Sequence, residues 1–582
     1  MRYLDIKAGI ARFFYNWKLI LLLGLLVLST WDWIELMNSG GLGFIRMNFG
    51  WLFITWVVFL GAARLITSGI LRTPAYWQVC FLGFLIAITP FFINVTPAFK
   101  HGLYLVIGLF GCLVCYLSIF QFGLSRNHLN QILILIIGIA FLQSVIALLQ
   151  LLHSLAMQYT SNVDEFLPTK ISGTFVQRNL LASYISTGLV ITYFLSLKKQ
   201  SFLKEVKKSY KLVFYGLRLY LFIGSFVLVC TESRIGLLSL ICGFLLLYLN
   251  NTPLNLRRHY KVIAPVLSGI LLGTIFIYIT YGENSKDFSF TQSREIMYLN
   301  SIEAIKDAPV LGHGLGSFEK AYVTKIGDQV ESEEYGVSYL YGRPANISHP
   351  HNELIYWAVQ GGLVSVTGLL LLSISVILPT LKAGLRRCLT YGSLFVPILL
   401  HMMVELPLYI SSLHILLIIF LAFYYVDSIG FTVKRNLRME TKVSKAGMLF
   451  IVSACVTVSS ILLLNIYSLK QAINYQEWSS RTEEQLSQSV IQLGWNDFYE
   501  ALLYKHRGNN GAKTGDLDKV HEYKNWLKNQ IEITPRLEYY LNLYRSYILL
   551  GDTDEAVTVK LDMQKKFAGV KQAIDAGVMD DE

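Results

Sequence analysis

The sequence has few charged residues for its length. Aspartate, glutamate, lysine and arginine make up 15% of its 582 residues, whereas 54% are hydrophobic. The mean hydropathy is +0.47. No ordinary soluble domain needs so much apolar material to build its core. The composition therefore excludes a soluble protein and predicts an all-α, polytopic bundle of transmembrane helices.

Apolar runs of about 20 residues, long enough to cross the roughly 30 Å of hydrocarbon in a bilayer, recur along the chain. We predict about thirteen spans, with centres near residues 27, 60, 86, 111, 141, 188, 221, 243, 271, 365, 398, 420 and 457. The first run has a charged start but lacks a small-residue cleavage site, so we read it as an uncleaved signal-anchor.

Basic residues are scarce in some loops and concentrated in others. They cluster at the N-terminus and in residues 198–211, 257–261, 381–387 and 433–445. The positive-inside rule places these segments in the cytoplasm. The segments between them then face outward: 154–178, 231–235, 281–350, 406–412 and the tail after residue 466. The basic clusters predicted to be cytoplasmic account for most of the net charge of +11. The net charge therefore does not imply binding to nucleic acid.

The chain also lacks several signatures of soluble catalytic or redox domains. Its seven cysteines all lie in or beside spans, where they cannot build an outward disulfide framework or a CxxC metal site. The glycines of "GHGLGSF" (312–318) lack the GK[ST] of a phosphate loop and predict a turn. Asp32 and Glu35 stand at the outward end of the first span, but no DxD signature accompanies them, which disfavours a metal-dependent glycosyltransferase.

The chain is predicted to have two parts. Residues 1–466 form the membrane domain, with a large outward loop at 281–350, and residues 467–582 form an outward helical tail. In the tail, residues 535–567 read as two amphipathic helices around a Gly-Asp turn, which resembles a tetratricopeptide unit. This module either holds an acceptor molecule or caps the membrane domain.

Three arginines lie on the outward side, against the charge bias of the chain: Arg178, Arg234 and Arg294. A guanidinium group binds phosphate or pyrophosphate through paired hydrogen bonds. Arg234 and Arg294 each follow a serine and are expected to begin a helix, where the dipole disfavours a cation unless an anion is bound. The alternative is that each arginine pairs with a loop carboxylate such as Glu232 or Glu295.

Two histidines stand at the start of an apolar helix in "SHPHNELIYWAVQGG" (348–362). Pro350 fits a first helical turn, so His349 and His351 lie at the outward N-terminus, where the helix dipole keeps an imidazole neutral. A neutral imidazole is a competent general base. Asn352 and Glu353 are expected to cap the helix or orient the ring.

The HxH pattern also occurs in zinc sites, which need a third ligand. His401 and Glu405 stand one turn apart on a single helix face and are the candidates for this ligand. A zinc hydrolase is therefore an alternative reading of the histidines.

Five stretches resemble, in order and approximate spacing, the O-antigen ligase and polymerase superfamily: "GTFVQRNLLASY", "SRIGLL", "REIMYLNSIEAIKDAPVLGHGLGSF", "HPHNELIYWAVQGGLV" and "HMMVELPLY". The resemblance covers about residues 130–430. Gln177 in "FVQRN", the "VELPLY" after His401 and the helical tail are most similar to the PglL-type protein O-oligosaccharyltransferases. Arg178 stands between Gln177 and Asn179 where this family usually has proline, so any role for Arg178 rests on its charge.

The resemblance implies a donor, a glycan on undecaprenyl pyrophosphate, and transfer without a metal or other cofactor at the bacterial inner membrane. It identifies His351 as the catalytic histidine, with the site and the C-terminus in the periplasm. The implied acceptor is a serine or threonine of a pilin or another periplasmic protein. We expect Arg234 and Arg294, with Arg178, to bind the pyrophosphate.

We expect five residues to orient the base or the acceptor, and the sequence does not rank them: His349, Asn352, Glu353, His401 and Glu405. Gln177 and Asn179 are also expected to be supporting residues of the site. Two alternatives stay open. One is an O-antigen ligase acting on lipid A core, or an O-antigen polymerase. The other is a transporter of lipid-linked glycan, for which we would expect inverted repeats that the sequence does not clearly show.

Overall fold

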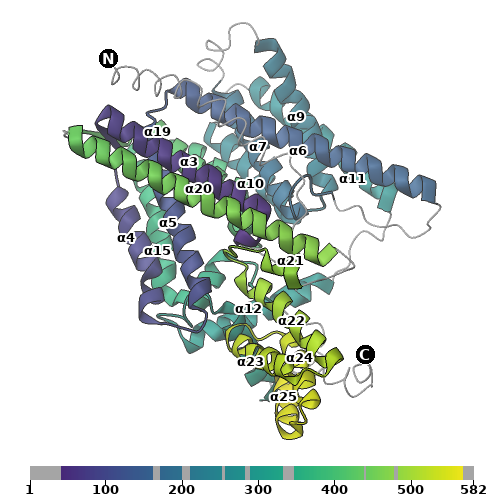
Figure 1. Ribbon diagram of the computed structural model, residues 1–582. Helices are drawn as coiled ribbons and strands as arrows, with labels where there is room; N and C mark the ends of the chain where they lie inside the picture. The colour runs from purple at the N-terminus through teal and green to yellow at the C-terminus, as the bar shows by residue number, and fades with distance from the viewer. Residues whose placement is uncertain are drawn as a thin grey trace.

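The structure is a computed structural model that describes residues 41–161, 171–198, 210–251, 256–281, 289–331, 347–437, 441–477 and 483–567. These ranges form a helical bundle with one two-stranded ribbon (Figure 1). The predicted span near residue 27, with Asp32 and Glu35, lies outside them, as do parts of the predicted loop 281–350.

Eight of the described helices are long and apolar enough to cross a membrane, which confirms the predicted class of fold. They are α3 (Ile45–Ser68), α5 (Phe99–Gln121), α6 (Arg126–Ser161), α7 (Arg178–Leu197), α10 (Arg234–Asn251), α11 (Leu256–Tyr281), α15 (Glu353–Ala383) and α20 (Thr441–Glu477). Three shorter apolar helices match further predicted spans: α4 (Trp77–Ile93), α9 (Tyr210–Cys230) and α19 (Ser412–Ser428).

The predicted span near residue 398 is divided into short pieces. They are α16 (Leu385–Gly392), the 3₁₀ turn η3 (Ser393–Phe395), α17 (Val396–Met402) and α18 (Pro407–Ile410). Pro407 explains the second interruption, because a proline disfavours helical geometry at the preceding residue. Leu406 accordingly has φ −111° and ψ 69°. Residues 403–406 therefore form a non-helical link between α17 and α18.

Helix α7 forms the centre of one half of the bundle. It packs against α6, α9, α10 and α17, and 89% of its spanning window is buried. Such a helix has no face left for lipid, which is why it tolerates hydroxyl residues in its interior. Thr187 and Thr192 each donate a hydrogen bond to the carbonyl four residues earlier. Helix α7 is thus enclosed by protein from Leu180 to Leu195.

The two ends of the bundle differ in composition. At one end, β1 (Ile70–Pro74) and β2 (Thr432–Asn436) pair antiparallel, with Arg72 opposite Lys434. At the other end lie the C-terminal helices α21 (Glu483–Ser487), α22 (Asn496–Thr514), α23 (Leu517–Ile533), α24 (Leu537–Leu549) and α25 (Thr553–Lys566) (Figure 1). Helix α5 connects the ends: His101 contacts Asp497 of α22 at 2.6 Å, and Gln121 accepts a hydrogen bond from the Arg72 amide at 3.0 Å.

The C-terminal helices are attached to the segment before α15. This segment contains α12 (Ser289–Asp307) and α13 (Phe318–Glu331). Arg536, at the start of α24, binds Glu319 of α13 through two contacts of 2.7 and 3.1 Å. Tyr322 of α13 belongs to the same apolar cluster as Tyr540 and Met563. The predicted boundary at residue 466 falls inside the continuous helix α20, and the division into two domains stays a prediction.

Helix α15 is broken at Gly362, where φ is 60° and ψ is −162°. The loop after α12 repairs the break with backbone hydrogen bonds. The amides of Leu363 and Val364 bind the carbonyls of Pro309 and Val310, at 2.8 and 3.1 Å. Hydrogen bonds also run in the opposite direction. The amides of residues 313 and 314, in the predicted glycine turn, donate to the carbonyls of residues 359 and 360 at 2.9 and 2.8 Å. This exchange satisfies the polar groups that a broken membrane helix exposes.

Substitution of Gly362 with alanine should destabilise the protein by about 1–3 kcal/mol, because it places a Cβ in a left-handed conformation. That Cβ would also collide with the Val310 carbonyl. The matched control is Gly138→Ala in α6, where a Cβ meets no atom within 4 Å and the change should be neutral or stabilising by up to about 1 kcal/mol. The measurement is the apparent melting temperature in detergent. Equal melting temperatures for the two variants would contradict a close fit at the break.

Candidate functional site

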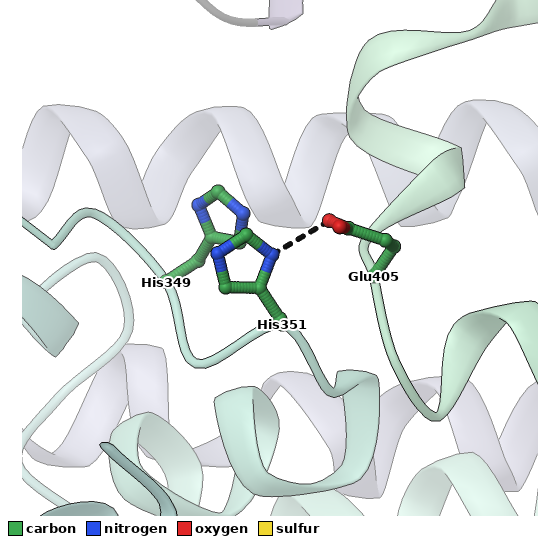
Figure 2. Close-up of side chains that lie close together, drawn as sticks. All are labelled: His349, His351 and Glu405. Atoms are coloured by element: carbon green, nitrogen blue, oxygen red, sulfur yellow. Dashed lines mark hydrogen bonds and ion pairs between the residues drawn. The ribbon is translucent and has the colours of Figure 1, made fainter. Parts of the chain in front are cut away.

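The site is built around a hydrogen bond between His351 and Glu405. His351 Nδ1 lies 2.6 Å from Glu405 Oε2 (Figure 2). A carboxylate can only accept, so the hydrogen bond requires the proton on Nδ1 and leaves the lone pair of the neutral ring on Nε2. The glutamate side chain is 6% exposed and the histidine side chain 31% exposed. The pair therefore offers a basic nitrogen at the surface with a buried carboxylate behind it.

The interrupted chain between α17 and α18 places this carboxylate. Glu405 keeps a helical hydrogen bond from its amide to the His401 carbonyl, at 2.9 Å. Asn352, beside the catalytic candidate, joins the same interruption to α15. Its Oδ1 accepts the Ile355 amide at 3.1 Å as a helix cap, and its Nδ2 donates to the Met403 carbonyl at 3.0 Å. Asn352 thus caps the helix as predicted. It also joins the segment that carries His351 to the segment that carries Glu405.

His351 has a strained backbone. Its φ is 50°, and in the described part of the chain only Glu232, with φ 53°, is another non-glycine residue with positive φ. The left-handed conformation costs an ordinary residue about 1–2 kcal/mol. Strained backbone of this kind is concentrated at functional sites. Both strained residues belong to the predicted site, His351 as the base and Glu232 as a candidate partner of the arginines.

His349 lies beside His351, with ring centroids 4.4 Å apart (Figure 2). Burial, together with the neighbouring His351, lowers the pKa of His349 to about 4. This value agrees with the prediction of a neutral imidazole. Its Nδ1 lies 2.9 Å from Ser348 Oγ, which leaves Nε2 of the ring for other contacts.

Arg294 is the arginine that contacts the pair. Its Nη2 lies 3.4 Å from Glu405 Oε1, and its side chain is 43% exposed. Burial alone would raise the pKa of the Glu405 carboxyl, but the hydrogen bond from His351 and the charge of Arg294 lower it below its usual value. The expectation that Arg294 begins a helix was wrong. Helix α12 begins at Ser289, so Arg294 lies in its second turn and its carboxylate partner is Glu405 rather than Glu295.

The other two arginines begin the neighbouring helices α7 and α10. Arg234 is the exposed first residue of α10, as predicted. Arg178 begins α7 and contacts Glu232 at 3.5 Å, the partner that the alternative reading named. Ser233 Oγ donates to Asn179 Oδ1 at 2.9 Å, which fastens the two helix starts together. The structure therefore brings Arg178, Asn179 and the 231–234 turn into one group.

A buried pair of histidines lies between this group and the His351–Glu405 pair. His401 and His414 are both 0% exposed, with ring centroids 5.9 Å apart. His414 is hydrogen-bonded to Ser183 of α7 at 2.9 Å and to Ser411 at 2.8 Å. Neither ring nitrogen of His401 has a hydrogen-bond partner among the described residues. The His401 carbonyl accepts the Glu405 amide at 2.9 Å, and the predicted role of His401 in orienting the base or the acceptor stays a prediction.

The sequence analysis missed His414. The signal was present in "LYISSLHILL", where a histidine follows two serines at the start of an apolar helix, since an ionisable residue in a span is a functional candidate. Two other predicted site residues, Gln177 and Glu353, stand at the starts of helices. Gln177 is the N-cap residue of α7. Glu353, the first residue of α15, is 4% exposed. One side-chain oxygen of each lacks a hydrogen-bond partner among the described residues.

One group of side chains has the geometry to hold a metal ion in the described ranges. His349, His351 and Glu405 each offer a ligand atom, and these atoms lie within 4.8 Å of one another. The third member is Glu405, whereas His401, the other candidate for a third ligand, is outside the group. The predicted absence of a metal cofactor stays a prediction.

The histidine pair predicts two stability changes of opposite sign. His401→Leu should stabilise the protein by about 1–3 kcal/mol, because it removes a buried polar group that has no partner. His414→Leu, the matched control, should destabilise it by about 1–2 kcal/mol, because it breaks two hydrogen bonds. Apparent melting temperatures in detergent measure both. A loss of stability in His401→Leu would show that its nitrogens are satisfied in the folded protein.

Comparison with known families gives two matches, which together reach from α9 into the C-terminal helices. Residues 219–373 match the family described as O-antigen ligase. Residues 390–578 match the family described as virulence factor membrane-bound polymerase, C-terminal. The first match contains Arg234, Arg294 and both histidines of Figure 2, and the second contains Glu405. No curated protein matches the chain. The two matches, one containing both histidines and the other containing Glu405, show similarity to an O-antigen ligase family and to a membrane-bound polymerase family, and they support a relation to the superfamily of O-antigen ligases and polymerases.

Proposed function

We propose that the protein is an O-linked oligosaccharyltransferase. It moves a glycan in one piece from undecaprenyl pyrophosphate to a serine or threonine hydroxyl of an acceptor protein, such as a pilin, on the periplasmic side of the inner membrane. The observation that carries the proposal is the 2.6 Å hydrogen bond between His351 and Glu405, with Arg294 at 3.4 Å from the same carboxylate. This arrangement brings together a base, His351, a group that orients the base, Glu405, and a cation for the leaving group, Arg294.

In the reaction, His351 Nε2 removes the proton of the acceptor hydroxyl as its oxygen attacks C1 of the first sugar. A bond from C1 to the acceptor oxygen forms, and the bond from C1 to the pyrophosphate oxygen breaks. Glu405 keeps the ring in the reactive tautomer and stabilises the imidazolium that forms. In-line attack inverts the configuration at C1. The donor is already activated, so the chemistry needs charge stabilisation and a base.

The arginines bind the leaving group. Lipid pyrophosphate gains negative charge as the C1 bond breaks, and guanidinium groups stabilise that charge through paired hydrogen bonds. Arg294 stands beside the base. Arg234 is exposed at the start of α10, a helix that packs against α17, and Arg178 supplies a third positive charge nearby. Helix N-terminal amides at Arg178 and Arg234 favour the same anion.

The charge distribution supports a periplasmic site. The β1–β2 ribbon, at the end of the bundle opposite the C-terminal helices, carries Arg72, Lys434 and Arg435. The positive-inside rule places such an end in the cytoplasm. The site lies at the other end, where α13 meets the C-terminal helices and α15 begins.

The choice of acceptor rests on the resemblance to PglL-type enzymes and on the C-terminal helices beside the site. A polymerase that extends a glycan is the second candidate, because the match over residues 390–578 is to a membrane-bound polymerase. Both reactions use the same donor and base, and they differ in the hydroxyl that attacks. The acceptor that gains mass therefore decides between them.

The test is transfer by the purified protein in detergent with a chelator, from undecaprenyl-pyrophosphate oligosaccharide to a pilin-like acceptor, followed by intact-mass spectrometry. His351→Asn should lower the rate by about 10²–10⁴-fold, because it removes the base. Asparagine tolerates the left-handed backbone at this position, so the variant should remain folded. A rate near that of the unaltered protein would exclude His351 as the base.

Glu405→Gln should lower the rate on the order of 10²-fold, because an amide cannot stabilise the imidazolium. The matched control is Glu295→Gln, an exposed carboxylate beside Arg294, which should transfer at the normal rate. Equal losses in both variants would mean that the effect is not specific to the carboxylate that binds His351. Transfer to lipid A core or to another glycan, with none to protein, would replace the proposed acceptor with that of a ligase or a polymerase.

A further inference from the structure

We propose that His349, His351 and Glu405 also bind a divalent transition-metal ion of the zinc class, and that this ion inhibits the site by occupying its base. The binding rests on the geometry of the three side chains alone. The inhibition rests on the proposed function, in which His351 is the base. The two parts therefore have separate tests.

The donor set is the first argument. Two imidazoles and one carboxylate are a ligand set of zinc enzymes and of other transition-metal sites, and such sites leave further positions open. Here the three ligand atoms lie within 4.8 Å of one another. Bonds of about 2.0–2.2 Å from one zinc ion would bring its ligand atoms to about 3.3 Å apart. Small side-chain rotations of His349 and His351, whose side chains are only partly buried, can supply this difference.

The protonation of the donors is the second argument. A metal ligand must carry a lone pair, so a protonated imidazole cannot bind. The contacts of the donors meet this requirement, because Glu405 accepts the hydrogen bond from His351 Nδ1 at 2.6 Å and so has lone pairs on its carboxylate oxygens. If His349 Nδ1–H donates to Ser348 Oγ, at 2.9 Å, the lone pair is on Nε2. A hydrogen bond of this kind behind a ligand orients the ring for the metal.

Binding removes the base by either available route. If the ion binds His351 at Nε2, it takes the lone pair that would accept the hydroxyl proton. If it binds between His351 and Glu405 at Nδ1, the proton on Nδ1 moves to Nε2. No proton leaves the ring in this second case, but the reactive tautomer is lost. In the first case the ion and the acceptor hydroxyl compete for the same electron pair, and in the second case Nε2 carries a proton and has no lone pair to accept another.

Arg294 opposes the metal. Its guanidinium nitrogen is 3.4 Å from Glu405 Oε1, and its positive charge repels a divalent cation bound to the same carboxylate. At about 6 Å in water-like surroundings, the repulsion between charges of +1 and +2 corresponds to roughly tenfold in affinity. Removal of the Arg294 charge should thus strengthen metal binding. This prediction is opposite in sign to the effect expected on transfer, where Arg294 binds the leaving group.

The experiment titrates Co²⁺ into the full-length protein in detergent after removal of metals, and records the visible absorption of the bound ion. We expect saturation at one ion per chain and displacement by Zn²⁺. Affinity should fall at least tenfold in His349→Gln and rise roughly tenfold in Arg294→Gln. The matched control is His153→Gln, an exposed histidine of α6, which should bind Co²⁺ as the unaltered protein does. Absence of the absorption, or equal affinity in His349→Gln and His153→Gln, would overturn the site.

The second measurement adds Zn²⁺ to the transfer assay. We expect the rate to fall with Zn²⁺ occupancy, as measured by displacement of Co²⁺, and to recover when chelator is added. A rate that rises with Zn²⁺, or that chelator abolishes, would overturn inhibition and make the ion a cofactor. If the protein transfers no glycan at all, the proposed function fails, while the Co²⁺ titration still decides whether the metal binds.

Discussion

Inside a bilayer, a backbone amide or carbonyl without a partner costs several kcal/mol, because no water is present to bind it. Continuous helices meet this constraint alone, and interrupted ones need help from other segments. The interruptions at Gly362 and at residues 403–406 both receive such help near the proposed site. The loop at 309–314 binds across the first, and the Asn352 side chain binds the Met403 carbonyl at the second. Because these bonds join distant segments, they also fix the relative positions of α12, α15 and α17.

The site itself reduces the stability of the fold. His351 has a strained backbone, and His401 is buried without a hydrogen-bond partner in the described part of the chain. Strained or destabilised positions are common where activity limits stability. The two features are therefore best explained by a function that needs a particular ring orientation and a polar environment behind Glu405.

The fold was largely predictable from the sequence because membrane spans need long apolar runs, and such runs are visible without any knowledge of contacts. The exception near residue 398 has a local cause in Pro407, which ends a helix that hydropathy alone would continue. The members of the site were also predictable, because charged residues and histidines are rare in such a chain. Their pairing was not. His351 and Glu405 are 54 residues apart, and only the packing of α15 against its neighbours shows that Glu405, rather than His401 or Glu353, holds the ring.

The length of α20 has a consequence for where the C-terminal helices lie relative to the rest of the protein. This single helix has 37 residues and is therefore about 55 Å long, at about 1.5 Å per residue, whereas the hydrocarbon is about 30 Å thick. Because α20 is one continuous helix, its length sets the axial position and the rotation of the helices that follow it. Each residue inserted into α20 would lift the helices that follow by about 1.5 Å and turn them by about 100°. Arg536 would then no longer face Glu319, so the length of α20 and the docking of α24 can change only together.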